Sequence, residues 1–317
     1  MEPSPPAIVG ASVDLGSNSV HLLVAAVAGH RLQPLADESV FLGLGDAVHD
    51  GGPLGAAKRA ELVAALGTYA DTARRLGATS ITFIGTEPLR RAADAARVVH
   101  DVVNASGVPL HILSHEEEAY LTLIGVMEGR PVTHETLVVD IGGGSSEFAT
   151  VGPNRPAAAA GLRLGSALLT SRHVANDPPT TAEVAAIGRT AREILAGAVT
   201  TAPSEIVGVG GTVSNLVKVL PAAIADRTLT RSRIAEIQEI LSTEPAALAS
   251  QRHLVNPIRA RLLPAGGAIV DAILERYGVD ELRVSEAGIR EGAVFAVQHA
   301  GPAWRDRLAD LARGWRT

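Results

Sequence analysis

Two acidic, glycine-containing turns of this chain have the residue types that hold a phosphate and a metal ion. The first, DLGSNS, begins at Asp14, and the second, DIGGGSSE, begins at Asp140. Each lies between two apolar stretches. Glycine has no Cβ, so backbone N–H groups in such turns can approach an anion closely. A carboxylate at the end of a buried strand can hold a hydrated divalent cation. The repeated turn therefore predicts a phosphate held between two similar lobes.

The second turn carries more chemistry than the first. Three successive glycines weaken a strand, and they are explained if the backbone wraps around an anion. Phosphate binding is therefore predicted for the loop Gly142, Gly143, Gly144 and Ser145. Asp140 and Glu147 flank this loop and are predicted to hold the metal, directly or through water. The alternative is a glycine hairpin turn without a ligand.

The first turn and two further segments supply the other candidate groups. Asp14 repeats the acidic position and is a further predicted metal ligand. Ser17 and Asn18 offer donors to phosphate, although an Asx turn would also explain Asn18. Arg90 follows an expected strand that ends at Gly85, and its guanidinium fork suits a phosphate. A third glycine turn leads from a strand into a helix, whose N-terminus attracts anions; its residues are Gly210, Gly211 and Thr212.

Three consecutive glutamates, Glu116 to Glu118, stand at the start of an expected helix, with Ser114 as its expected N-cap and Glu117 at the capping-box position. One carboxylate facing a phosphate could orient and deprotonate water. Successive helical residues point about 100° apart, so at most two of the three can face one site. Acidic residues also favour a helix start through the macrodipole. Spacing alone therefore favours an exposed helix start.

Strands alternate with helices in both halves of the chain, which predicts an α/β architecture. The aspartates of the two turns are 126 residues apart (140 minus 14), which indicates two related domains with the ligand in a cleft between them. We place the boundary at the polar break after Glu128, with domains at 1–128 and 129–317. The tail from about residue 301 is amphipathic and is expected to pack back on the N-terminal domain. The expected strands are 80–85, 110–113, 205–212 and 281–285, and the expected helices are 58–76, 92–105, 116–127, 182–200, 262–277 and 289–299.

The composition excludes several classes of function. The 317 residues include no cysteine, so thiolate metal sites and a cysteine nucleophile are excluded. Only 3% are aromatic and the net charge is −6, which disfavours nucleic-acid binding by base stacking. The first six residues carry no basic region, and no apolar run reaches transmembrane length. We predict a cytoplasmic protein without a membrane or nucleic-acid partner.

Several stretches together resemble the exopolyphosphatase and guanosine pentaphosphate phosphohydrolase (Ppx/GppA) family, within the actin, Hsp70 and sugar kinase superfamily. They span almost the whole chain in the family's order and are 13–19, 85–90, 114–119, 139–147, 208–212 and 285–292. The resemblance implies two actin-like (ribonuclease H-like) domains with mixed sheets and flanking helices, of the short two-domain type. A homodimer is left open.

The same resemblance implies residue roles. The family's catalytic glutamate immediately precedes an alanine, which selects Glu118 from the three candidates. Asp140 and Glu147 correspond to metal-site acids, with Mg²⁺ as the expected cation. Asn18, Arg90 and the glycine loops correspond to phosphate-binding groups. The implied reaction is hydrolysis of the terminal phosphoanhydride bond of polyphosphate, or alternatively of guanosine pentaphosphate.

Three positions depart from the family pattern: His115, Tyr120 and Arg261 stand where glycine, arginine and aspartate are usual. They put the preferred substrate and chain length in question more than the hydrolysis. Two other classes remain as alternatives. One is a superfamily kinase that transfers phosphate from ATP to an acceptor, and the other is a non-catalytic polyphosphate or nucleotide sensor.

Overall fold

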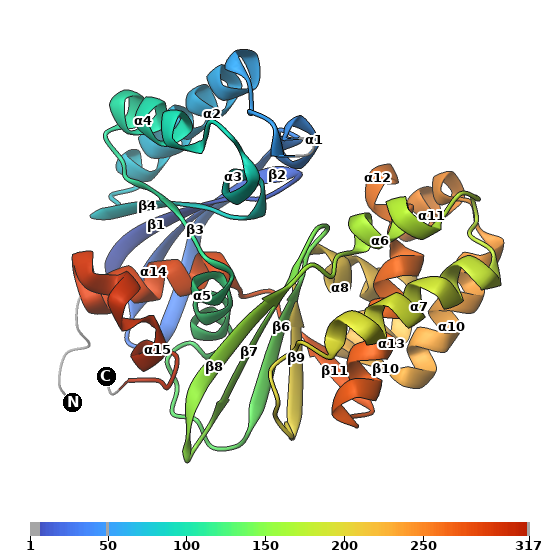
Figure 1. Cartoon of the computed structure of the whole chain (residues 1–317). Helices are drawn as coiled ribbons and strands as arrows, with labels where there is room; N and C mark the ends of the chain where they lie inside the picture. The colour runs from blue at the N-terminus through green and yellow to red at the C-terminus, as the bar shows by residue number, and fades with distance from the viewer. Residues whose placement is uncertain (1–6, 49–50, 316–317) are drawn as a thin grey trace. The chain divides into compact units, whose positions relative to one another are not determined.

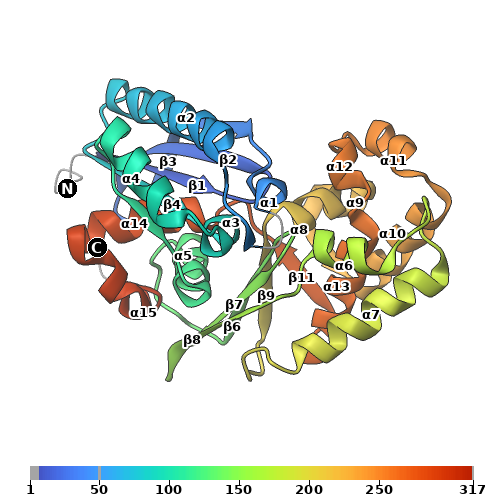
Figure 2. The ribbon, with the colours of Figure 1, turned by 45° about the horizontal axis from the view of Figure 1, so that its top comes forward.

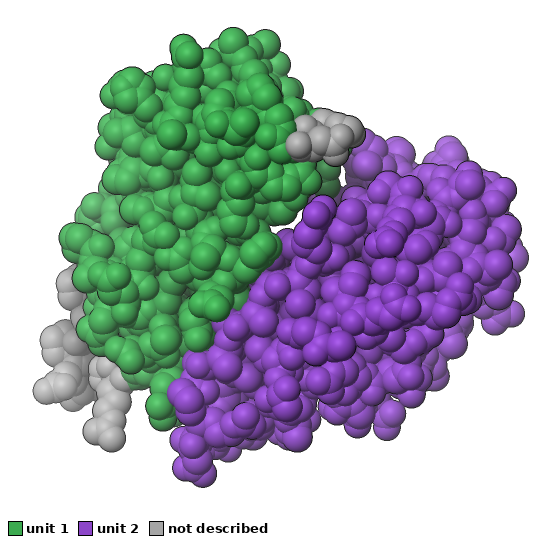
Figure 3. Space-filling view, in the orientation of Figure 1, with its two compact units in different colours: residues 1–131, 289–317 green, residues 132–288 purple. Residues whose placement is uncertain are grey.

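The structure is a computed structural model that describes residues 7–48 and 51–315. Met1–Pro6, on which the predicted absence of a targeting segment depends, lie outside this range. The chain forms two compact units: Met1–Pro131 with Ile289–Thr317 (unit 1), and Val132–Gly288 (unit 2), coloured green and purple in Figure 3. Each unit contains its own cluster of buried apolar side chains. Among the described residues, no helix is both long and apolar enough to cross a membrane.

Unit 1 is built on a five-stranded mixed sheet with the order β3-β2-β1-β4-β5. The strands are β1 Ile8–Leu15, β2 Ser19–Ala28, β3 Arg31–Phe41, β4 Ser80–Gly85 and β5 Leu110–Ile112. β1, β2 and β3 form an antiparallel meander, whereas β4 and β5 add in parallel. β1, β2 and β4 are apolar and largely buried, which explains why their sequences lack a clear alternation.

Unit 2 is built on a six-stranded mixed sheet with the order β10-β11-β9-β6-β7-β8. Its strands are β6 Thr136–Ile141, β7 Ser146–Gly152, β8 Arg155–Leu162, β9 Glu205–Val209, β10 Thr228–Thr230 and β11 Glu281–Val284. Read from β8, the order and directions repeat those of unit 1, with β10 added outside β11. The predicted fold class of two related α/β domains with mixed sheets is confirmed.

Helices cover both faces of the unit 1 sheet (Figures 1 and 2). On one face lie α2 (Ala56–Arg75) and α4 (Ala95–Ser106), and on the other lie α5 (His115–Met127) and α14 (Ile289–Ala300). The short α1 (Leu44–Ala47) and α3 (Glu87–Arg91) follow β3 and β4. The sequence prediction assigned 289–300 to the second domain. Helix α14 belongs to unit 1 instead, because its apolar residues are buried on α5 and β1.

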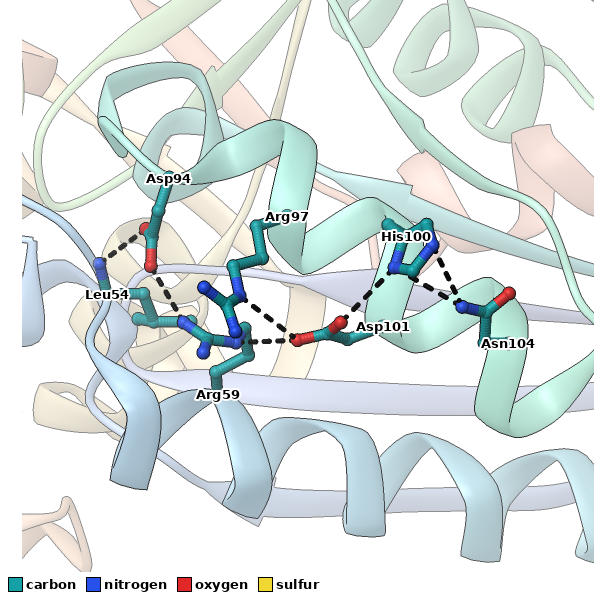
Figure 4. A network of polar contacts seen from close by, with 7 residues as sticks. All are labelled: Leu54, Arg59, Asp94, Arg97, His100, Asp101 and Asn104. Atoms are coloured by element: carbon teal, nitrogen blue, oxygen red, sulfur yellow. Dashed lines mark hydrogen bonds and ion pairs between the residues drawn. The ribbon is translucent and has the colours of Figure 1, made fainter.

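A polar network joins α2 to α4 (Figure 4). The Arg59 guanidinium contacts Asp94 at 3.0 Å and Asp101 at 2.7 Å, and Asp94 also accepts from the backbone N–H of Leu54. The Arg59 side chain is only 12% exposed. A paired and hydrogen-bonded charge of this kind fixes geometry, so the network holds the two helices in register.

The residues after Ala300 also belong to unit 1. They form a 3₁₀ helix, Gly301–Arg307, and the short α15 (Leu308–Leu311), which bury Trp304, Leu308 and Leu311. The Trp304 ring meets the His111 ring edge-on, with 5.4 Å between the centroids. This segment is therefore docked through its apolar side chains.

The helices of unit 2 that pack on its sheet lie on one side in Figure 1. The three longest are α7 (Thr181–Leu195), α10 (Arg231–Thr243) and α13 (Leu263–Tyr277). The shorter ones are α6 Ser166–His173, α8 Gly211–Leu216, α9 Pro221–Asp226, α11 Ala246–His253 and α12 Pro257–Ala260. Helix α7 begins with a capping box between Thr180 and Glu183. Hydrogen bonds from the Thr180 and Ala175 N–H groups are the main cause that lowers the pKa of Glu183 to about 2.

Candidate active site in each unit

The first glycine turn of unit 1 connects β1 to β2. It closes with a hydrogen bond from the Gly16 N–H to the Ser19 carbonyl (3.1 Å). The segment after β3 supports the turn through two backbone hydrogen bonds. The Gly43 N–H donates to the Asn18 carbonyl (2.8 Å), and the Gly45 N–H donates to the Ser17 carbonyl (2.7 Å). These carbonyl oxygens would repel an anion. Their engagement leaves the backbone N–H groups of Ser17 and Asn18 and the Asn18 side chain available to a ligand.

Arg90 and Glu118 meet in unit 1. Arg90 lies on α3 and donates from Nη1 to Glu118 Oε2 at 2.5 Å and to the Leu113 carbonyl at 3.0 Å. Its Nη2 lies 3.0 Å from His115 Nδ1. The side chains of Arg90 and Glu118 are only 15% and 10% exposed. Charge-assisted hydrogen bonds are short and directional, so this contact fixes the orientation of the Glu118 carboxylate.

The three consecutive glutamates have different surroundings. Glu116 is exposed. Glu117 completes the predicted capping box with Ser114 and also binds Arg305. Burial tends to raise the pKa of Glu117, but the hydrogen bonds from Arg305 and Ser114 outweigh it, so the pKa lies below its ordinary value. Glu118 alone of the three is buried and contacts Arg90, which distinguishes it from its neighbours on structural grounds.

In unit 2 the second turn repeats the geometry of the first. The Gly142 N–H donates to the Ser145 carbonyl at 3.0 Å, and Asp140 on β6 is paired directly with Glu147 on β7. The start of α6 supports the loop: its Ser166 and Leu168 N–H groups donate to the carbonyls of residues 142 and 143 at 3.1 and 2.9 Å. The carbonyl oxygens of residues 142, 143 and 145 are therefore engaged, and the N–H groups of residues 143–145 are left for an anion.

The third glycine turn packs against the second. Gly210 has φ +89°, and a Cβ there would lie 2.3 Å from Asp140 Oδ1, so only glycine lets the chain pass this close to the carboxylate. The Thr212 hydroxyl lies 3.1 Å from Ser166 Oγ and 3.5 Å from the Gly142 carbonyl. The side chain of Thr212 therefore contacts the support of the second turn.

Arg259 on α12 is a candidate that the sequence reasoning missed. Its Nη1 lies 1.8 Å from where a Cβ on Gly211 would be, so the guanidinium covers the third turn. Burial lowers the pKa of Arg259 below its usual value. Within residues 7–48 and 51–315, its guanidinium has no hydrogen-bond or ion-pair partner. The signal that could have indicated it is the stretch Arg259-Ala260-Arg261, in which the sequence analysis considered only Arg261, as a departure from the family pattern.

The three positions that depart from the family pattern have identifiable surroundings. His115 is the first residue of α5 and lies beside Arg90. The phenol of Tyr120 has a raised pKa because of burial, with a smaller contribution from the charge of Glu116. Arg261 donates to the Asn176 carbonyl at 2.9 Å and lies 3.4 Å from Asp177. The arginine at this position thus ties α12 to the loop before α7.

Comparison with known proteins gives consistent matches over most of the chain. Exopolyphosphatase 2 of Mycobacterium tuberculosis is 28% identical, covering 90% of this chain and 98% of the relative. Guanosine-5'-triphosphate,3'-diphosphate pyrophosphatase of Vibrio cholerae is also 28% identical, but the match covers only 58% of its length. The crystal structure of the Aquifex aeolicus member of the Ppx/GppA family superposes with a TM-score of 0.83 at 27% identity, covering 93% of this chain and 99% of that one.

A single match to the Ppx/GppA phosphatase family extends over residues 23–300. The match begins within β2, so it excludes β1 and the first turn. It covers the whole unit 2 sheet and the other segments on which the resemblance was based, 85–90, 114–119, 139–147, 208–212 and 285–292. It confirms the predicted family, the actin-like fold class and the class of enzyme, a phosphoanhydride hydrolase. The chain belongs to the Ppx/GppA phosphatase family.

Proposed function

We propose that this protein is an exopolyphosphatase, which hydrolyses the terminal phosphoanhydride bond of inorganic polyphosphate and releases phosphate. The main support is the extent of the match to Exopolyphosphatase 2 of Mycobacterium tuberculosis, since the match covers 98% of that protein. Guanosine pentaphosphate is the second candidate substrate, which the Vibrio cholerae pyrophosphatase supports over a smaller share of its length. The cytoplasmic location and the homodimer stay predictions.

We assign phosphate binding to the groups that the turns and the two arginines present. In unit 2 these are the loop Gly142 to Ser145, through the N–H groups of residues 143–145, and Gly210 and Gly211 of the third turn, with Arg259. In unit 1 they are the backbone N–H of Ser17, the amide groups of Asn18, and Arg90. Guanidinium and backbone N–H donors suit the spread charge of a phosphoryl group. Thr212 holds the loop in place through Ser166 rather than acting as a primary donor.

The residues of unit 2 fit a hard divalent cation. Asp140 and Glu147 are directly paired across β6 and β7, and Glu147 is 3% exposed. Like charges in directly paired positions of a sheet destabilise it, and Mg²⁺ is commonly bound by one or two carboxylates. We assign these two residues to Mg²⁺, with Asp14 of the first turn as a further carboxylate. When bound, the ion neutralises charge on phosphate oxygens.

Glu118 is proposed as the general base. Its carboxylate orients a water molecule and accepts one proton while the water oxygen bonds to the terminal phosphorus. The bond from that phosphorus to the bridging oxygen breaks, and the shortened polyphosphate leaves. Phosphoryl transfer depends mainly on positioning and electrostatic stabilisation, which fits a site made of turns, arginines and one oriented carboxylate.

A phosphate-release panel tests this function. We expect release from polyphosphates in the presence of Mg²⁺, little release from ATP, and loss of release after chelation with EDTA that is restored by added Mg²⁺. Preference for guanosine pentaphosphate would favour the second candidate. ATP consumption that depends on an added acceptor would indicate a kinase, and tight binding of polyphosphate without release under several metals would indicate a sensor.

Replacing Arg259 should weaken substrate binding. Hydrogen bonds to charged groups contribute about 1.5 to 3 kcal/mol, so Arg259→Ala should raise KM about ten- to hundredfold at a conversion of roughly 1.4 kcal/mol per factor of ten. Arg189→Ala, an exposed arginine on α7, is the control and should leave KM unchanged. Steady-state kinetics on polyphosphate measure both, and an unchanged KM for Arg259→Ala would remove this residue from the site.

A further inference from the structure

Glu87, the first residue of α3, contacts the first glycine turn directly. Its Oε2 accepts a hydrogen bond from Ser17 Oγ at 3.2 Å, and its Oε1 lies 2.9 Å from Arg91 Nη1. The Glu87 side chain is 17% exposed. Neither the sequence reasoning nor the family resemblance gave Glu87 a role. A partly buried carboxylate beside a turn that binds anions requires an explanation, since its charge opposes that of a phosphate.

Helix α3 links this contact to the catalytic glutamate. Of its five residues, Glu87 holds Ser17 at one end, and Arg90 holds Glu118 near the other. The preceding Thr86 donates from Oγ1 to the Leu15 carbonyl at 3.0 Å, which anchors α3 to the end of β1. The helix is therefore fixed at both ends to groups assigned to the reaction.

Arg91 balances the charge of Glu87. Besides forming the ion pair, Arg91 donates from Nη2 to the carbonyl of Val48, in the segment after β3 that supports the turn. Glu87 and Arg91 are four residues apart on α3, a spacing at which side chains meet on one helix face. The pair presents no net charge to the turn while keeping an acceptor beside Ser17.

We propose that Glu87 is a positioning residue that fixes the Ser17 hydroxyl, and with it the Gly16–Ser19 turn, for phosphate binding, while Arg91 balances its charge. The proposal rests on the proposed function. A serine hydroxyl has one proton, and in this arrangement Glu87 receives it. The turn then meets a phosphate through its backbone N–H groups and Asn18, and Ser17 serves as a brace.

The experiment compares Glu87→Ala, Glu87→Gln, Arg91→Ala, and Ser17→Ala alone and combined with Glu87→Ala. Loss of one charge-assisted hydrogen bond should raise KM about tenfold for Glu87→Ala, with kcat within about twofold. Glu87→Gln keeps an acceptor for Ser17 and should restore KM to within about twofold of the wild type. Arg91→Ala leaves the carboxylate unbalanced and should raise KM most strongly at low salt.

The double variant tests whether Glu87 acts through Ser17. If it does, Ser17→Ala with Glu87→Ala should have the KM of the worse single variant, because both changes remove one interaction. Multiplicative effects, an unchanged KM for Glu87→Ala, or no rescue by Glu87→Gln would each overturn the proposal. So would a melting temperature that falls in parallel with the rise in KM, since this would indicate a general structural role.

Inorganic phosphate, the expected product, serves as a binding probe that separates this proposal from the proposed function. We titrate phosphate into the wild type and each variant in the presence of Mg²⁺ and measure Kd by calorimetry. The variants should rank in Kd for phosphate as they rank in KM for polyphosphate. If the Kd values of the wild type and the variants follow this ranking but the wild type releases no phosphate from polyphosphate, the proposed function fails and the role of Glu87 stands. If release is normal and the ranking is absent, the role of Glu87 fails alone.

Discussion

Glu118→Gln should retain the fold and lose about 10² to 10⁴-fold in kcat, the range that general-base catalysis contributes. Glutamine has nearly the same shape and keeps an oxygen that can accept from Arg90 Nη1, now 2.5 Å from Glu118 Oε2. It cannot accept a proton from water at neutral pH. KM should change little, because the groups assigned to phosphate binding are intact. Steady-state phosphate release measures both constants, and circular dichroism checks the fold.

Glu116→Gln is the matched control for this variant. It makes the same chemical change two residues earlier on α5, at an exposed position, and should keep wild-type kcat. Near-normal release by Glu118→Gln would contradict the general-base role. A loss of more than tenfold in Glu116→Gln would instead indicate that the charge of the α5 N-terminus, and not one positioned carboxylate, carries the effect.

The sequence predicted the elements whose signals are local. The Ser114–Glu117 capping box and α5, the strand at 80–85 and the pair of glycine turns all appear in the structure within a few residues of the prediction. Cap chemistry and glycine geometry depend on near neighbours, so a linear pattern contains them. Glu118 could not be chosen from spacing, because its contact with Arg90 joins residues 28 positions apart.

Elements without a local signal were missed. The edge strand β3 is mostly exposed and includes a proline, and β8 contains four consecutive alanines, which have low strand propensity. Both form strands because they pair with a neighbouring strand, β3 with β2 and β8 with β7. Arg259 was missed for a similar reason: its proximity to Gly211 is set by the packing of α12, and nothing in the adjacent sequence distinguishes it from the other arginines.

The two turns have the same backbone and different chemistry. Asp14 is paired across the strands with His21, whereas Asp140 is paired with Glu147. Only the second turn therefore places two carboxylates directly opposite each other, the arrangement that suits a cation. The duplicated fold supplies a similar backbone turn in both units, and one cross-strand position distinguishes the turn to which we assign the metal.

Gly292→Ala should destabilise unit 1 strongly. Gly292 lies on α14 where that helix crosses α5, and a Cβ there would be 1.8 Å from the Leu121 carbonyl oxygen and 3.1 Å from the Gly125 nitrogen. Both atoms belong to the α5 backbone, so no side-chain rotation can relieve the clash and the helices must separate. Forcing extra atoms into a packed interface costs up to about 3 kcal/mol, which corresponds to a fall of roughly 6 to 12 °C in the melting temperature of a unit of this size.

The same separation should reduce turnover, because Leu121 lies one helical turn from Glu118, and a displacement of about 1 Å at a catalytic group can cost 10²-fold in rate. Gly67→Ala is the matched control. Gly67 lies in α2, and a Cβ there would meet no described atom within 4 Å beyond its own helix, so alanine should raise stability by about 0.5 to 1 kcal/mol through helix propensity. Differential scanning calorimetry of both variants tests the contrast. Equal melting temperatures would show that α5 and α14 tolerate a wider crossing, and the anchoring of Glu118 would then have to come from Arg90 alone.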